Sequence, residues 1–164
     1  MKPRSFAALL LTCLPLLAVA QDTTFQTRSL TPEVALIAAR SALEQCRKQG
    51  FQVAVAVVDR SGLTQVLLRD RFAGAHTLDV ASGKAWTAAS FRTPTSALAN
   101  ETQPGKAMSG LRNVPRFIPV GGGLVIEGGG VVFGAIGVSG GPGGDADEAC
   151  AAAGIRAIAE SIEF

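Results

Sequence analysis

The sequence predicts an α+β fold in which helices pack on an antiparallel sheet of four to five strands. Two pairs of short β-branched segments are each joined by a turn that contains glycine. Segments with the apolar periodicity of helices stand before, between and after these pairs. Residues 21–164 suffice for one domain with its own core, and we find no linker or repeat that would divide them.

Residues 1–20 have the pattern of a secretory signal peptide. Lys2 and Arg4 precede an apolar run, and Ala18 and Ala20 are the small residues of a cleavage site. We therefore expect cleavage after Ala20 and a location in the periplasm or outside the cell. The apolar run is too short for a stable anchor, so no membrane insertion is expected after cleavage.

The first helix has clear start and stop signals. Thr31 supplies a capping side chain, Pro32 suits the first helical position, Glu33 is an acidic first-turn residue, and Gly50 ends the helix. Its expected inward face consists of Val34, Ile37, Ala38, Leu43 and Cys46.

The remaining elements follow from alternation, helical periodicity and breakers. We expect strands at 51–58 and 63–69, a helix at 77–91, a short helix at 96–101, a loop at 102–119 with a helical turn near Met108, and strands at 122–127 and 131–138. A last helix is expected at 145–162, with Ile155, Ile158, Ala159 and Ile162 facing inward.

The charge of the chain excludes some partners. Of the 15 Lys and Arg residues, 13 lie after residue 20, where they are matched by 13 Asp and Glu. A neutral chain without basic runs lacks the phosphate-neutralising patch that nucleic acids require. For the same reason we expect no anionic membrane surface as a partner.

The two cysteines after residue 20 leave two structures open. Cys46 falls near the end of the first helix and Cys150 near the start of the last. A disulfide forms if those helices pack side by side, whereas two buried free thiols are equally compatible with the pattern. A zinc site of the usual Cys/His type is excluded, because the chain has a single histidine.

The glycine-rich segment 137–144 lies between a strand and a helix, where phosphate loops occur. It contains no nucleotide-binding motif, and Asp145, Asp147 and Glu148 put negative charge where a phosphate would bind. Nucleotide binding is therefore not expected.

His76 is the single histidine of the chain. A Ser-His-Asp triad could be drawn with Asp79, but no nucleophile-elbow motif is present. A histidine at a helix start is often a plain surface residue, yet a neutral imidazole is also the common protein ligand of haem iron.

Several short motifs, in order and spacing, resemble the GlcG/HbpS family of haem-binding proteins over nearly the whole mature chain. They are Asp59-Arg60-Ser61-Gly62, Arg69, Ala73-Gly74-Ala75, Gly83-Lys84-Ala85-Trp86-Thr87-Ala88, Gly121-Gly122-Gly123, Gly134-Ala135-Ile136-Gly137-Val138-Ser139-Gly140 and Asp147-Glu148. The resemblance implies a profilin-like α/β domain that self-associates into dimers or larger assemblies. It also implies haem binding and redox sensing, and it extends to the C-terminal part of some corrinoid adenosyltransferases.

Because haem ligands differ among members of that family, the candidate site residues are chosen by their side-chain chemistry. His76 is the candidate iron ligand, with Met108 as the second candidate. Arg69 and Lys84 are the expected partners of the haem propionates. The motif glycines expected at the pocket are Gly121, Gly122, Gly137 and Gly140. The chain departs from the family pattern at 124–126, which lacks the usual proline, and at 141–144.

Three functions stay open at this point. The first is an exported haem-binding protein that buffers haem or senses redox state. The second is an oligomeric accessory module that docks on a partner without haem. The third is an enzyme that acts on a small anionic metabolite through Lys84, although the sequence shows no nucleophile and no acid and base pair.

Overall fold

The computed structural model describes residues 23–163. The predicted signal peptide at 1–20 lies outside this range. Within it, no helix combines the length and apolar character needed to cross a membrane.

Ten helices and strands make up the described chain. They are α1 (Pro32–Lys48), β1 (Ala54–Asp59), β2 (Thr64–Arg69), α2 (His76–Phe91), α3 (Thr95–Glu101), the 3-10 helix η1 (Ser109–Asn113), β3 (Gly123–Gly128), β4 (Val131–Ser139), α4 (Gly144–Arg156) and α5 (Ala159–Ile162). The predicted hairpins and helices are present with boundaries shifted by a few residues, except that the last predicted helix is divided in two.

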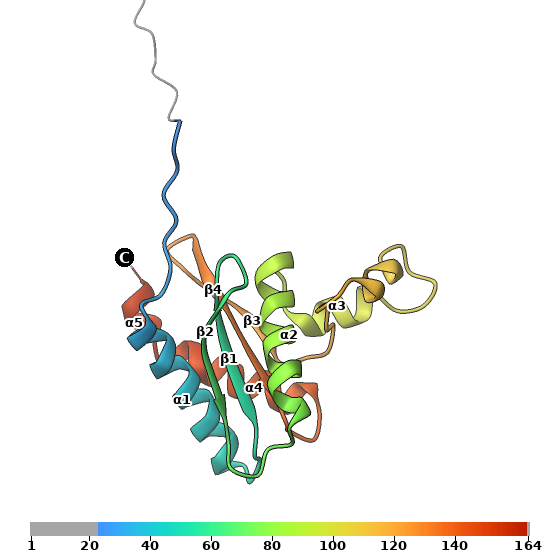
Figure 1. The fold of residues 1–164 in the computed structure, drawn as a ribbon, viewed down its shortest axis with the longest axis horizontal. Helices are drawn as coiled ribbons and strands as arrows, with labels where there is room; N and C mark the ends of the chain where they lie inside the picture. The colour runs from blue at the N-terminus through green and yellow to red at the C-terminus, as the bar shows by residue number, and fades with distance from the viewer. Residues whose placement is uncertain (1–22, 164) are drawn as a thin grey trace, which may run out of the picture.

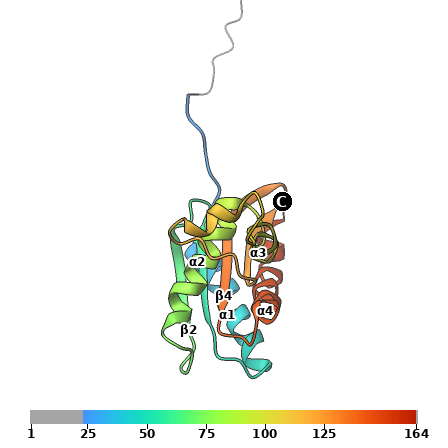
Figure 2. The same ribbon diagram turned by 90° about the vertical axis from the view of Figure 1, so that its right-hand side faces the viewer.

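The four strands form one antiparallel sheet in the order β2-β1-β4-β3. Each hairpin is a sequential strand pair, and the two hairpins meet where β1 pairs with β4, with Ala56 opposite Gly137. Helices α1 and α4 cover one face and α2 covers the other (Figure 1, Figure 2). The predicted α+β class is therefore confirmed.

Strand β1 is buried on both faces. Val53, Val55 and Val57 point into the core under α1 and α4, whereas Ala54 and Ala56 lie under α2. Alternation of side chains along a strand produces this division. The small residues under α2 let that helix approach the sheet closely.

The inward face of α1 was only partly predicted. Ala38, Leu43 and Cys46 are buried as expected, but Ile37 is 49% exposed. The buried positions that were missed are Ala35, Ala39 and Ala42. The alanine face allows α1 to lie directly against α4, where the carbonyl oxygen of Ala38 contacts Gly154.

The predicted single helix at 145–162 is wrong, because it divides into α4 and α5. The chain leaves α4 after Arg156, and both Ile158 and Ile162 are then buried in the core. Ile162 packs against the backbone of Gly128 at the end of β3. After the break that follows Arg156, the chain brings Ile162 to the end of β3.

Two links attach α1 to the rest of the domain. A disulfide joins Cys46 to Cys150 of α4, with 5.6 Å between the Cα atoms, so the bridge rather than the pair of free thiols is present. Next to it, Arg47 Nε and Nη2 donate hydrogen bonds of 2.6 and 2.8 Å to the two carboxylate oxygens of the buried Asp70. This fork geometry is the strong form of an Arg–carboxylate pair.

We predict that Gly137→Ala destabilises the domain by about 1–3 kcal/mol, the usual effect of overpacking. The added methyl group would meet the Ala81 carbonyl oxygen and lie 2.6 Å from the Ala85 backbone nitrogen, forcing α2 off the sheet. Urea denaturation measures the change. Gly110→Ala is the control, since nothing lies within 4 Å of its added Cβ. Equal stability of the two variants would contradict this packing.

We also predict a pH-dependent contribution from Asp70. The hydrogen bonds from Arg47 lower the pKa of this carboxyl, aided by the Arg71 backbone N–H, although burial acts in the opposite direction. Because the unfolded chain then binds the proton more readily, the contribution is complete above the ordinary aspartate pKa of about 3.9 and is lost as pH falls through the lower folded-state pKa.

In Asp70→Asn, unfolding free energy at neutral pH should therefore decrease, and the further loss between about pH 5 and pH 2 should be smaller than in wild type. Glu127→Gln, a change at an exposed carboxylate, is the control. An unchanged acid limb in Asp70→Asn would refute the assignment.

Candidate functional site

A cavity of about 470 Å³ lies at the N-terminal end of α2. Its walls come from the loop before α2, the first three turns of that helix, the segments that precede β1 and β3, the end of β4 and the start of α4. The lining residues are Gln52, Phe72, Gly74, His76, Thr77, Val80, Lys84, Val120, Ser139, Gly140, Gly141, Gly143, Gly144 and Asp147. The volume is within the range of small-molecule and cofactor sites.

Gln52 and Ser139 form the floor of the cavity, at the end of the sheet face that α2 covers. Ala54 and Ser139 are paired across β1 and β4, and Gln52 precedes Ala54 by two residues. Since side chains alternate along a strand, Gln52 and Ser139 lie on the same face as Ala54. The Gln52 Oε1 atom is buried without a hydrogen-bond partner among residues 23–163. A buried acceptor of this kind is costly unless something donates to it.

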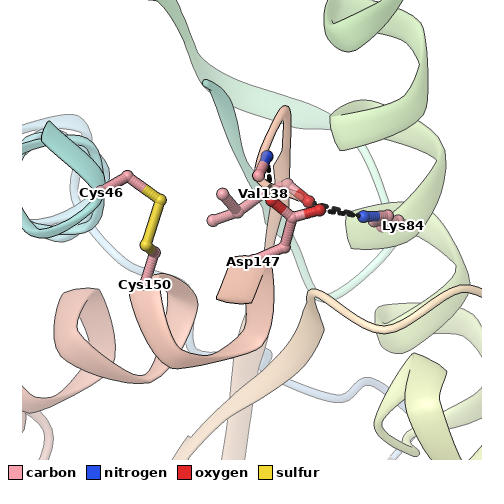
Figure 3. The surroundings of a disulfide bond; sticks show 6 residues. Cys46, Lys84, Val138, Asp147 and Cys150 are labelled. Atoms are coloured by element: carbon pink, nitrogen blue, oxygen red, sulfur yellow. Dashed lines mark hydrogen bonds and ion pairs between the residues drawn. A yellow bond between two sulfur atoms is a disulfide. The ribbon is translucent and has the colours of Figure 1, made fainter. Parts of the chain in front are cut away.

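The buried ion pair of Lys84 and Asp147, which Figure 3 shows, lies at the back of the cavity. Lys84 Nζ donates to Asp147 Oδ2 at 2.7 Å and to the Val138 carbonyl oxygen at 2.9 Å. The Lys84 and Asp147 side chains are 2% and 5% exposed. Asp147 Oδ1 also accepts a 2.8 Å hydrogen bond from the Gly141 backbone N–H. The charge of Lys84 is therefore balanced inside the protein.

Unlike the buried Lys84–Asp147 ion pair, His76 is exposed to solvent. His76 is the first residue of α2 and is exposed at the cavity. Its ring lies over Gly74, where a Cβ would come within 2.7 Å of the ring atom Cε1. Within residues 23–163 the His76 side chain makes no hydrogen bond or ion pair. Both ring nitrogens are thus available to a ligand.

The cavity mouth has an apolar rim. Phe72 is 80% exposed and Val120 is 48% exposed, and Val80 lies on the α2 side. Large apolar side chains left in water beside a cavity are typical of a surface that a ligand or partner covers. The site therefore combines an apolar mouth, an imidazole and a polar floor.

Of the predicted site residues, the structure brings His76, Lys84 and Gly140 together at this cavity. Gly122 lies directly behind it, where an added Cβ would be 3.0 Å from Lys84 Nζ. Gly121 contacts Gly144 and lines an adjacent cavity with Ser96 and Arg112.

The other predicted residues lie elsewhere. Gly137 is buried under α2, where it packs against the helix backbone and does not line the cavity. Arg69 faces a different depression, and its Nη1 donates to the Ala73 carbonyl oxygen at 2.7 Å, beneath the loop that carries Phe72. Met108 is 38% exposed just before η1 and does not line the cavity.

The lining residues that were missed as site residues include Gln52, Phe72, Ser139 and Asp147. For Gln52 and Ser139 a signal existed, because each is a polar residue in phase with the small apolar residues of its strand. For Asp147 the signal was ambiguous, since an acidic residue in the first turn of a helix already has a role in stabilising the helix dipole.

We predict that Asp147→Asn destabilises the domain by about 3–5 kcal/mol, the usual effect of removing one partner of a buried ion pair. The Lys84 ammonium would stay buried without a countercharge. The double variant Lys84→Met/Asp147→Leu removes both charges and should be more stable than Asp147→Asn alone. Urea denaturation compares the three proteins. A single variant as stable as wild type would show that the pair is not buried in solution.

The chain is similar to known proteins over most of its length. The model of the family described as "Haem degrading protein HbpS-like" matches residues 30–156. A crystal structure of a double mutant of Streptomyces reticuli HbpS shares 39% identity with a TM-score of 0.77, covering 88% of this chain and 97% of that one. The crystal structure of Klebsiella pneumoniae ORFY shares 29% identity with a TM-score of 0.80, covering 84% and 95%.

Two relatives link this fold to larger proteins and to a ligand. The crystal structure of a complex of PduOC with heme shares 31% identity with a TM-score of 0.75, covering 79% of this chain and 95% of that one. The corrinoid adenosyltransferase PduO of Salmonella typhimurium is 34% identical over 104 residues, which are 62% of this chain but only 31% of that protein. The family match and these structures together show that the chain belongs to the HbpS-like family.

Proposed function

We propose that this protein binds haem in the cavity at the N-terminal end of α2, with His76 as the protein ligand of the iron. The observation that carries this proposal is the unpaired His76 imidazole at the mouth of a cavity of about 470 Å³ with an apolar rim. A related protein, PduOC, was crystallised in complex with heme. The fold is the same, and so the cavity chemistry must decide whether haem fits here.

The residues present fit the group. A porphyrin needs apolar contact over its faces, which Phe72, Val80 and Val120 offer. An iron ligand needs a ring nitrogen that no other group of the described chain occupies, which His76 offers. When bound, haem supplies an iron centre that can change oxidation state. The chain itself contributes ligation, orientation and partial exclusion of water.

The propionates need cations, and the two predicted ones differ. Lys84 is already neutralised by Asp147 and is almost fully buried. The Arg69 guanidinium is exposed and is held under the loop that carries Phe72. Neither predicted cation therefore meets a propionate in this cavity, since Arg69 faces a different depression.

We further propose that the protein is exported and buffers haem or senses redox state in the periplasm or outside the cell. The Cys46–Cys150 bridge supports this, because disulfides persist in oxidising compartments. The charged and apolar pattern of residues 1–20 supports it as well.

A second candidate function is an oligomeric accessory module without haem. Leu63 and Leu67, at 65% and 43% exposure, lie beside and on β2, which is an edge strand of the sheet. Exposed apolar residues at a sheet edge favour association with another chain. A homo-oligomer is compatible with both candidates, and light scattering of the purified protein would measure its size.

The test is a hemin titration followed in the Soret region. We predict saturation at a simple ratio for the wild-type protein and binding at least about tenfold weaker, or an altered Soret band, in His76→Ala. Met108→Ala is the matched control, since Met108 lies outside the cavity and should bind as wild type does.

The outcomes separate the candidates. Saturation that His76→Ala leaves unaltered would keep haem binding and refute the ligand assignment. Absence of saturation, with an unrelated protein as the reference for nonspecific binding, would overturn the haem proposal and favour the accessory module. A substrate-dependent activity abolished by Lys84→Ala would instead favour the enzyme.

A further inference from the structure

Each cysteine of the disulfide lies close in sequence to a residue that holds one wall of the cavity. Arg47 follows Cys46, and Asp147 precedes Cys150 by three residues. Cys46 is followed in α1 by Arg47, whose guanidinium holds Asp70 with two hydrogen bonds. Asp70 begins the loop that carries Phe72 and Gly74 to the cavity, and its backbone carbonyl accepts a hydrogen bond from Ala73. The position of this wall therefore depends on where the end of α1 lies.

The other wall is connected through α4 (Figure 3). Cys150 lies one helical turn after Asp147 on the same helix. Asp147 holds Lys84 of α2 through one carboxylate oxygen and the Gly141 backbone N–H through the other. The loop 140–144 and the inner side of α2 are thus positioned from the start of α4.

The helices α1 and α4 approach each other closely through small residues. The contact is made largely by small residues, with Gly154 against the Ala38 carbonyl oxygen and the Ala42 side chain. Small side chains bury little apolar area and interlock little, so they oppose sliding of one helix along the other only weakly. The covalent bridge adds a fixed link between the two helices at this contact.

We propose that the Cys46–Cys150 disulfide is a positioning element of the cavity, which holds the Asp70 loop and the Asp147 wall at the separation that the ligand needs. The bridge touches neither ligand nor cavity, since both cysteines are fully buried. The inference rests on the proposed function for the identity of the ligand but not for the coupling of the two walls.

A purely stabilising disulfide makes a different prediction. It would raise the melting temperature and leave the folded cavity unchanged, so ligand affinity measured well below the melting temperature would not depend on it. A positioning disulfide changes the affinity of the folded protein and the local stability of the two walls. These readouts separate the two roles.

The experiment uses the full chain with Cys46→Ala/Cys150→Ala and hemin as the probe. We expect hemin binding about tenfold weaker than in wild type, similar to the loss of supporting residues at other metal sites. Amide hydrogen exchange without hemin should become faster at 71–76 and 140–147 than in the β1–β4 pair. Ile162→Ala, a core truncation remote in sequence from both walls, should lower the melting temperature yet leave hemin affinity and wall exchange as in wild type.

Wild-type hemin affinity and wild-type exchange at the two walls in the cysteine variant would overturn the proposal. If the wild-type protein does not bind hemin, the proposed function fails and the exchange experiment alone decides on the coupling. If the alanine pair does not fold, Cys46→Val/Cys150→Ala restores part of the missing volume and takes its place. An equal effect of Ile162→Ala on affinity would also refute a specific role of the bridge.

Discussion

The architecture depends on a single buried ion pair that joins two layers around the end of a strand. Helices α2 and α4 lie on opposite faces of the sheet (Figure 2). Lys84 extends from α2 past the end of β4 and meets Asp147 of α4, while its ammonium also donates to the Val138 carbonyl oxygen. A buried ammonium requires both partners to be in place. The helix, the strand end and the glycine loop are therefore fixed relative to one another.

The residues under α2 explain why a cavity lies at its N-terminal end. Along most of its length α2 lies close to the sheet, because Gly137 and the alanines of β1 and β4 leave room for its backbone. Near His76 the sheet residues below the helix change to Gln52 and Ser139, and the loop after β4 is built from glycines. The helix end is thus held above a hollow rather than packed on a core.

Local patterns were sufficient for the elements but not for their arrangement. Alternation identified both hairpins, and helical periodicity identified α1, α2 and the start of α4, because each signal involves neighbours within a few residues. The partner of Lys84 is 63 residues away, and Asp145, Asp147 and Glu148 are equally suited by composition. Only the packing of α4 turns Asp147 inward, so the pair follows from the fold and not from the motif.

The candidate site shows the same division. His76 could be selected because it is the single histidine, and its role as a helix-start residue is what places it at the cavity mouth. Lys84 was selected as a charged residue among alanines, and its burial is real, but its charge is used within the protein. Met108 had suitable chemistry without a position at the cavity. The sequence selected candidates by side-chain chemistry, whereas the fold decides which of them line the cavity.

The family relationship constrains the fold more tightly than the activity. The chain is similar to HbpS, to ORFY and to one part of a corrinoid adenosyltransferase, and it spans about a third of the last of these. Proteins that share this scaffold can differ in what they bind, because specificity lies in a few rim residues. Here the rim is Phe72 and Val120 around an imidazole, and the nearby lysine is neutralised. The cavity therefore offers a bound molecule apolar contacts and one imidazole, but no unpaired cation among its lining residues. These groups favour a flat molecule with a metal centre over a small anion.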